Sequence, residues 1–286
     1  MTMRVRLIIA IAAAVLFSFV ALLMRVPVPS PEPFVSQIHR SYFPLVARAH
    51  DARKGVGLKY AGCDAVDKLG VSWFYNWGFD SDGVMCSGKS GYVDMIFGSN
   101  NVSDTIRTPI VIGFNEFTNI DQSNMSITQT VIAWRIVEVR HPNRYKVSPS
   151  AGPGRFDLWR VADLYHDVFD HYPLWDAVNL HWYDNHGGGM TLQQYVETMH
   201  AEAVKRGYRS LWLTEFAACL PQSAEGKIAK LREWLTWLSA QAYIARWAWY
   251  AGRTGDADPF DRMCASELVD GLGNLTPIGI AYRDWP

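Results

Sequence analysis

The stretch Pro109-Ile-Val-Ile-Gly-Phe-Asn-Glu-Phe-Thr118 joins an apolar run of strand length to an abrupt polar end. The run predicts a buried strand, and the Glu116 carboxylate should emerge where that strand meets its loop. The stretch Leu211-Trp-Leu-Thr-Glu-Phe216 repeats the design, because side chains alternate along a strand and Glu215 shares a face with the core leucines. In a barrel of parallel strands, this end of the strands carries the chemistry.

Strand-like and helix-like segments alternate from Gly55 onward, which indicates a parallel α/β architecture. The strand candidates are residues 56–60, 71–75, 93–97, 110–114, 145–148, 177–182, 211–215 and 244–249. Helices are expected over residues 126–138, 191–206 and about 225–241, with a short final helix opened by Thr276 and Pro277. Thr191 and Gln194 form a capping box. We therefore predict a (β/α)8 TIM barrel, with a truncated helix after strand three because that connection is short.

Composition divides the chain into three parts. Residues 1–25 hold an uncharged, mostly apolar run from Leu7 to Met24 behind Arg4 and Arg6, which predicts a signal anchor or a signal peptide. An anchor is favoured because no convincing cleavage site follows the run. Residues 26–53 read as a proline-rich linker and lead-in. Residues 54–286 have the length of one large α/β barrel domain.

Charge and cysteine content narrow the environment and the partners. Of the whole chain 49% is apolar and the net charge is close to zero, so no basic face for nucleic acid is expected. Four cysteines in an exported domain predict two disulfides, for which three pairings exist. Pairing between adjacent loops is preferred because the first two cysteines follow strands one and two and the others follow strands seven and eight. The four residues are Cys63 and Cys86, and Cys219 and Cys264.

Five motifs of the chain resemble glycoside hydrolase family 128. They are Gly113-Phe-Asn-Glu116, His181-Trp-Tyr183, Trp212-Leu-Thr-Glu-Phe-Ala217, Ser72-Trp-Phe-Tyr-Asn-Trp-Gly78 and the closing Leu275-Thr-Pro277. The resemblance runs from about Lys54 to the C-terminus. It implies the clan of retaining (β/α)8-barrel glycosidases, whose characterised members in this family cut β-1,3-glucans.

The resemblance also implies roles for three residues. Glu116 would be the acid/base, Glu215 the nucleophile, and Asn115 would lie beside the sugar 2-hydroxyl. The chain departs from the family pattern at Phe117, where proline is usual, and at Val93-Asp-Met-Ile-Phe97, where the family has an apolar-Pro-Met-x-Trp strand. Asp94, Phe97 and Phe117 leave the catalytic pair intact but concern the shape of the subsites and the linkage of the substrate.

The chemistry of two carboxyl groups supports the same roles without the resemblance. Retaining hydrolysis needs two carboxyl groups about 5 Å apart, one ionised to attack and one protonated to assist the leaving oxygen. A carboxylate at Glu215 and apolar neighbours such as Phe117 are expected to raise the pKa of Glu116. The alternative for each glutamate, taken singly, is an exposed loop residue or a salt-bridge partner.

Aromatic and polar residues crowd the same strand ends and predict a glycan-binding cleft, because ring faces pack on pyranose rings. Core packing is the rival explanation for the aromatic residues, and a satisfied core histidine is the rival for His181. No zinc, calcium or phosphate-loop spacing occurs, so no metal or cofactor is expected. The predicted substrate-binding residues are Tyr75, Asn76, Trp77, His181, Trp182, Tyr183, Trp247 and Trp249, together with Asn115.

The sequence therefore predicts a retaining β-glucanase, endo-acting on a β-1,3-linked polymer and tethered to a membrane outside the cytoplasm. The expected partners are the polysaccharide substrate and the membrane. One alternative is a catalytically silent glycan-binding barrel in which Phe117 misplaces the acid. Another keeps the catalytic pair but acts on a different exported polysaccharide, as a glycosidase or a transglycosidase.

Overall fold

The computed structural model describes residues 51–79, 86, 89–221, 223–253 and 264–286. The predicted membrane segment, residues 1–25, and most of the predicted linker lie outside these ranges. Within the described ranges, no helix combines the length and the apolar character needed to cross a membrane.

The strands of the described chain are all parallel to their neighbours and form two sheets. One sheet has the order β2-β1-β8-β7-β6 and the other β3-β4-β5. Single parallel bridges, Phe74 to Tyr92 and Val147 to Ala177, connect the two sheets at both seams. Each strand therefore neighbours the next strand in sequence, and β8 neighbours β1. The strands are β1 Lys54–Gly57, β2 Trp73–Tyr75, β3 Asp94–Met95, β4 Ile110–Ile112, β5 Tyr145–Val147, β6 Val178–Tyr183, β7 Leu211–Ala217 and β8 Ile244–Trp249.

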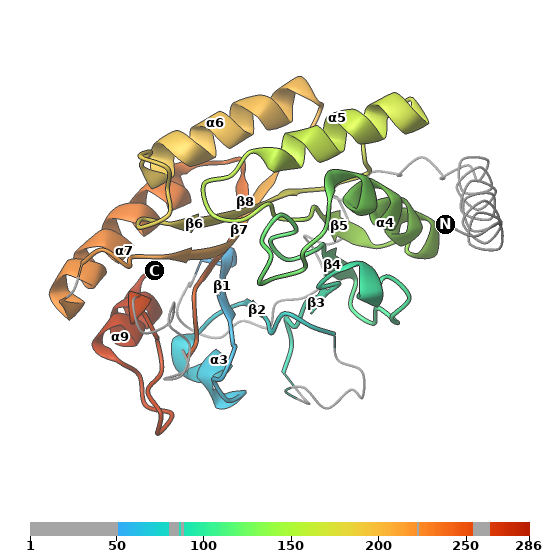
Figure 1. The fold of residues 1–286 in the computed structure, drawn as a ribbon. Helices are drawn as coiled ribbons and strands as arrows, with labels where there is room; N and C mark the ends of the chain where they lie inside the picture. Colours follow the sequence, from blue (N-terminus) through green and yellow to red (C-terminus); the bar gives the residue numbers. More distant parts are fainter. Residues whose placement is uncertain (1–50, 80–85, 87–88, 222, 254–263) are drawn as a thin grey trace, which may run out of the picture.

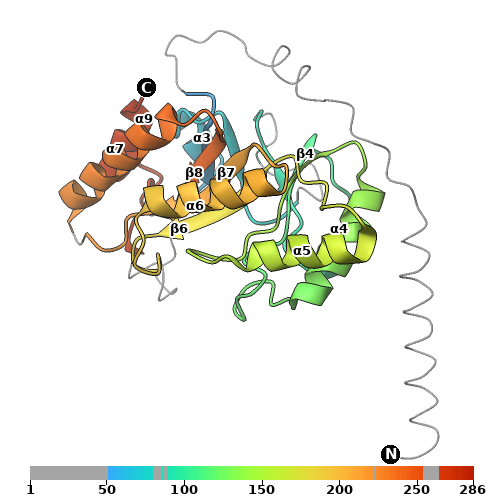
Figure 2. The same ribbon diagram turned by 90° about the horizontal axis from the view of Figure 1, so that it is seen from above.

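Helices follow every strand except β2 in the described chain, and they lie outside the strands (Figure 1). Helix α9 packs against α7 and α3, so the C-terminal helix lies beside the first described helix, as Figure 2 also shows. The connection between β3 and β4 holds only a 3-10 helix, as the prediction of a truncated helix required. The helices are α3 Asp64–Leu69, η1 Ser99–Asn101, α4 Ile127–Arg140, α5 Asp157–Phe169, α6 Leu192–Lys205, α7 Ala224–Ala240 and α9 Pro277–Asp284.

Local sequence explains where the predicted helices begin. The capping box of Thr191 with Gln194 is present, and Ser126 with Gln129 forms a second one at the start of α4. Thr276 caps α9 and Pro277 follows at the first helical position. Helix α5 was not predicted from the sequence, because its N-cap, Phe156, supplies no side-chain hydrogen bond to mark its start.

The strand that carries Glu116 is brought very close to its neighbour. A Cβ atom on Gly113, just after β4, would lie only 2.6 Å from the backbone nitrogen of Pro149. Only glycine permits this approach of the two backbones, which sets where the chain beyond β4 leaves the sheet.

Both disulfides have the predicted adjacent-loop pairing. Cys63 bonds to Cys86, and Cys219 bonds to Cys264. The sequence separations are 23 and 45 residues, for which loop-closure entropy gives stabilisation on the order of 3–4 kcal/mol each. The second bond connects the segments after β7 and β8, close in sequence to Glu215 on β7.

Candidate active site

Glu116 follows β4 in a strained backbone conformation. Its φ is 42°, in the left-handed region that non-glycine residues enter at a cost of roughly 1–3 kcal/mol. Ser150 holds this turn: its Oγ accepts from the Glu116 N–H at 3.0 Å, and its carbonyl accepts from the Phe117 N–H at 3.0 Å. These two hydrogen bonds to buried Ser150 hold the strained backbone at Glu116, and the fixed backbone orients the Glu116 side chain.

The three residues that depart from the family pattern, Phe117, Asp94 and Phe97, make packing or hydrogen-bond contacts within the fold. The Phe117 side chain is fully buried in the hydrophobic core. Asp94 is also fully buried, and its carboxylate accepts from the N–H groups of Arg107 at 2.8 Å and Thr108 at 2.9 Å. Phe97 packs beside the cluster that contains Trp73. Asp94 thus anchors the segment before β4, and the Phe117 ring packs in the core.

Glu215 lies on β7 and is held by aromatic donors. The Tyr183 hydroxyl donates to Oε2 at 2.6 Å, and the Trp77 indole N–H donates to Oε1 at 2.6 Å. The Tyr75 hydroxyl donates to the Thr214 carbonyl at 3.0 Å and lies 3.4 Å from Oε1 of Glu215. Charge-assisted bonds of this length fix the orientation of the carboxylate.

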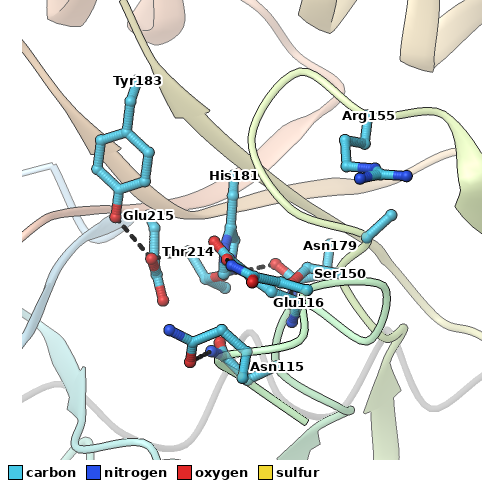
Figure 3. Close-up of polar contacts among 12 residues, drawn as sticks. Asn115, Glu116, Ser150, Arg155, Asn179, His181, Tyr183, Thr214 and Glu215 are labelled. Carbon is cyan, nitrogen blue, oxygen red and sulfur yellow. Dashed lines mark hydrogen bonds and ion pairs between the residues drawn. The ribbon is translucent and has the colours of Figure 1, made fainter. Parts of the chain in front are cut away.

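His181 lies between the two glutamates (Figure 3). Its Nδ1 is 2.9 Å from Oε1 of Glu116 and 3.4 Å from Oε2 of Glu215. One donor atom from each of the three side chains lies within 4.8 Å of the others. All three residues are buried, so their interactions take place away from bulk water.

Metal-ligating atoms gather with such spacing in one group of the described residues, these same three side chains. Hydrogen bonds already account for their approach. Asn119 Nδ2 donates to Glu116 at 3.1 Å, and Tyr183 and Trp77 donate to Glu215. We therefore assign the cluster no metal role.

The charges of the cluster set three pKa values. Burial raises the pKa of Glu116, but the hydrogen bond and charge of His181, with the Asn119 bond, bring it below its ordinary value. Burial raises the pKa of Glu215; the charge of His181 opposes this, but the charge of Glu116 adds to it, and the pKa stays above its ordinary value. Burial lowers the pKa of His181, but the two carboxylates more than offset it and raise that pKa.

The predicted pKa order of the glutamates is therefore wrong for the free protein. We expected the raised pKa on Glu116, because the sequence placed His181 only as a residue lining the cleft. His181 in fact lies within hydrogen-bond distance of Glu116, and its charge favours the ionised form of that carboxyl.

Three predicted substrate-binding tryptophans lie in the core instead. Trp182 stacks on Tyr195 of α6, with ring centroids 5.4 Å apart. Trp249 packs against Phe216 and donates its indole N–H to the Ser266 carbonyl. Trp247 is fully buried beneath the Arg53 guanidinium. On β6, alternation along the strand places Trp182 on the face opposite His181 and Tyr183.

Three predicted substrate-binding residues around β2 make contacts within the protein. The Tyr75 ring is fully buried and Trp77 packs on it with ring centroids 4.8 Å apart, its N–H directed at Glu215. Asn76 Oδ1 accepts from the Tyr92 hydroxyl and the Gly78 N–H, so it shapes the loop.

Asn115 donates to Gln122, and its Oδ1 is buried without a protein partner among the described residues. An unsatisfied acceptor beside Glu116 suits a ligand hydroxyl.

Several residues of the site were not predicted from sequence. Thr214 lies 3.0 Å from Nε2 of His181, and Asn179 accepts from the Thr214 hydroxyl. Polar residues inside the apolar strands β6 and β7 were the available signal, because a buried polar group needs a partner. The others are Ser150, Asn119 and Tyr250, whose ring meets those of Trp77 and Tyr183 edge-on.

Comparisons with known proteins show the family and the fold of the chain. Residues 57–282 match the family model described as "Glycosyl hydrolase catalytic core". A search of curated protein sequences gives no match.

Solved structures share the fold at low sequence identity. The chain is similar to a family 128 (subgroup II) endo-β-1,3-glucanase from Sorangium cellulosum, with 24% identity and TM-score 0.62, over 82% of this chain and 98% of that one. It is also similar to a subgroup III curdlan-specific exo-β-1,3-glucanase from Blastomyces gilchristii in complex with glucose. The sequence identity is 23% and the TM-score 0.60, over 81% of this chain and 97% of that one. A third similar structure is a subgroup I endo-β-1,3-glucanase from Amycolatopsis mediterranei in complex with laminaritriose. The sequence identity is 20% and the TM-score 0.62, over 82% of this chain and 100% of that one.

Proposed function

The chain belongs to the glycosyl hydrolase catalytic core family, and from that premise we propose that it is a retaining, endo-acting β-1,3-glucanase of the family 128 type. The parallel strands would form a (β/α)8 barrel, with the two sheets joined at the bridges Phe74 to Tyr92 and Val147 to Ala177. The catalytic pair would be Glu116 and Glu215.

The spacing of the two carboxylates carries this proposal. Donor atoms of Glu116 and Glu215 lie within 4.8 Å of each other, with His181 bound to both. Retaining glycosidases hold their carboxyl groups about 5–5.5 Å apart, whereas inverting enzymes need roughly 6.5–9.5 Å to admit a water molecule. The spacing therefore supports direct attack by one carboxylate.

We assign Glu215 as the nucleophile because Tyr183 and Trp77 donate to its carboxylate and the Tyr75 hydroxyl lies 3.4 Å from it. Its carboxylate would attack the anomeric carbon as the bond to the leaving oxygen breaks and Glu116 delivers a proton to that oxygen. Water would then attack the glycosyl-enzyme, with Glu116 taking its proton, and Glu215 would leave with the electron pair. Asn115, with its unsatisfied Oδ1, would accept a hydrogen bond from the 2-hydroxyl.

The substrate and the mode of cleavage are carried over from the similar structures. The Sorangium and Amycolatopsis enzymes are endo-β-1,3-glucanases and the Blastomyces enzyme is an exo-β-1,3-glucanase. Two observations support a catalytic barrel over a silent glycan-binding one: the Phe117 ring is buried in the core, and the Glu116 N–H is hydrogen-bonded to Ser150. A different exported polysaccharide is tested by hydrolysis of a glycan panel, in which laminarin-type glucans should be cleaved fastest.

Export and membrane attachment are part of the proposal. The two disulfides suit an oxidising compartment outside the cytoplasm. Residues 1–25 would anchor the domain, and residues 26–53 would hold it away from the membrane.

Azide distinguishes the two glutamates by stereochemistry. With an activated aryl β-glucoside, Glu215→Ala leaves a space in which azide attacks directly, and the glycosyl azide should have inverted configuration. Glu116→Ala should still form the glycosyl-enzyme, since an activated leaving group needs little acid help, and azide should give the retained product. On glucan itself, Glu116→Ala should lose about 10²–10⁴-fold in rate.

The matched control is Glu233→Ala, which removes an exposed glutamate of α7. It should hydrolyse glucan at the parent rate and form no glycosyl azide beyond the parent level. Exchanged stereochemistry in the two test variants would exchange the roles, and near-parent rates for both would end the assignment.

A further inference from the structure

A chain of buried polar groups lies behind His181, on the side away from Glu116. His181 Nε2 is 3.0 Å from the Thr214 hydroxyl, which donates at 2.6 Å to Asn179 Oδ1. Thr214 and Asn179 are 1% and 2% exposed, and the Asn179 amide nitrogen has no partner among the described residues. Burying such groups among apolar strands is costly, so their persistence needs a reason.

The hydrogen bonds dictate where His181 carries its proton. The single hydroxyl hydrogen of Thr214 points to Asn179, so Thr214 presents only a lone pair to His181. Nε2 must then bear a hydrogen in both the neutral and the cationic ring. Nδ1, 2.9 Å from Oε1 of Glu116, donates in the cation, accepts when the proton has moved to Glu116, and carries no hydrogen once the pair has given the proton up.

We propose that Thr214 and Asn179 are positioning residues that keep His181 in its Nε2–H form, so that His181 and Glu116 together hold the proton that the leaving sugar oxygen takes. This rests on the proposed glycosidase function. It assigns a purpose to two polar residues that touch neither glutamate side chain.

Protons balance over the proposed cycle. The resting pair is imidazolium and carboxylate, bearing one transferable proton. As the glycosidic bond breaks, Nδ1–H passes its proton to Glu116 and Glu116 gives one to the leaving oxygen, which leaves neutral His181 and ionised Glu116. In the second step the pair takes one proton from the attacking water and returns to its resting state.

Other titratable groups face the pair from neighbouring elements. Burial raises the pKa of the Tyr75, Tyr183 and Tyr195 hydroxyls above the ordinary value, so these three stay protonated at neutral pH. The groups are Glu215 on β7, Tyr183 on β6, Tyr75 on β2, Tyr195 on α6, and Tyr250 and His186 in the loops after β8 and β6.

Thr214→Val tests the proposal because valine matches the shape of threonine but offers no lone pair. The imidazolium loses an acceptor, so the pair should release its proton more easily and the alkaline limb of the kcat profile should move down by about one pH unit. At the parent's optimum kcat should fall about tenfold or more, with KM little changed. Thr214→Ser keeps the hydroxyl and should keep the parent's alkaline limb.

Nitrogen-15 NMR of the histidine rings supplies a readout that needs no substrate. His181 signals are identified by their loss in His181→Gln. In the parent above the pH of His181 deprotonation, Nε2 should carry the hydrogen and Nδ1 should not. A neutral ring with its hydrogen on Nδ1, or an alkaline limb in Thr214→Val equal to the parent's, would overturn the proposal. An inactive parent would instead overturn the proposed function, while the NMR result would still decide the tautomer.

Discussion

At the residue scale, Glu215 shows how the free protein prepares a buried carboxylate. Burial and the charge of Glu116 raise its pKa, whereas His181 and the bonds from Tyr183 and Trp77 lower it. Glu215 must be ionised to act as the proposed nucleophile, so each donor that favours the carboxylate should extend activity towards lower pH. Trp77, which donates one of these hydrogen bonds, lies in a loop and has a φ of 64°.

Trp77→Phe should therefore move the acid limb of the pH profile. Phenylalanine keeps a ring against Tyr75 but removes the N–H that donates to Glu215 at 2.6 Å. Losing a hydrogen bond to a charged group costs about 1.5–3 kcal/mol. The pKa of Glu215 should rise further, the acid limb should move to higher pH, and kcat/KM should fall roughly 10- to 100-fold. The measurement is kcat/KM on laminarin as a function of pH.

Trp73→Phe is the matched control for that substitution. Its indole N–H donates to the Arg53 carbonyl at 2.9 Å, and neither glutamate lies among its hydrogen-bond partners. Its acid limb should stay at the parent's position. Equal displacement of the limb in both variants would mean that indole loss acts through packing and not through Glu215.

At the element scale, Glu138 of α4 connects two helices and a loop. It is fully buried and accepts from Trp134 at 2.8 Å, from the Leu174 N–H at 2.7 Å, and from the Tyr165 hydroxyl of α5. Burial raises its pKa more than these bonds and the charge of Arg135 lower it. The helix contact therefore depends on a carboxyl that binds its proton more tightly in the folded protein than in the unfolded chain.

Glu138→Gln should change stability in a pH-dependent way. A raised folded-state pKa gives stability that is fully present below the unfolded pKa, about 4.3, and lost as pH rises through the folded pKa. Glutamine cannot titrate, so the loss in free energy of unfolding relative to the parent should be larger at pH 4 than at pH 7. The difference should be about 1.4 kcal/mol for each tenfold difference in proton affinity. Urea unfolding of residues 54–286 at both pH values measures it.

Glu233→Gln, on the exposed face of α7, is the control and should show no change between the two pH values. A destabilisation by Glu138→Gln that was larger at pH 7 than at pH 4 would reverse the sign and contradict the argument.

At the scale of the whole molecule, the two disulfides and the proposed anchor point to one compartment. Both bonds join loops near the strand ends that bear the site, so a reducing environment would loosen the domain where it must be rigid. The uncharged run from Leu7 to Met24 is long enough for a bilayer.

The full chain should therefore fractionate with membranes, and its domain should be open to protease added outside the cytoplasm. A form without residues 1–25 should stay in the cytoplasm with reduced cysteines. Cell fractionation and peptide mapping without reductant check both expectations. Recovery of a soluble exported form that begins just after Met24 would show a cleaved signal peptide instead of an anchor.

The sequence by itself determined the parallel α/β architecture and favoured the disulfide pairing that the structure has. Local signals sufficed there: apolar runs, capping residues such as Thr191, and cysteines in successive loops. The positions of the two glutamates were less exact, because β4 ends at Ile112, before Glu116, and β7 continues beyond Glu215 to Ala217. The predicted strand boundaries were less accurate, because a strand extends only as far as its backbone pairs with a neighbouring strand. The strand predicted over residues 93–97, for example, covers only Asp94–Met95.

Only the tertiary structure decided which side chains face the site. Trp182 and Tyr183 are adjacent in sequence, yet one packs on α6 and the other donates to Glu215. The pKa order of Glu116 and Glu215 was likewise beyond the sequence, because it depends on His181, which is 65 residues from Glu116 along the chain and 2.9 Å away in space. Charge and hydrogen bonding act through distance and burial, and neither is written in local sequence.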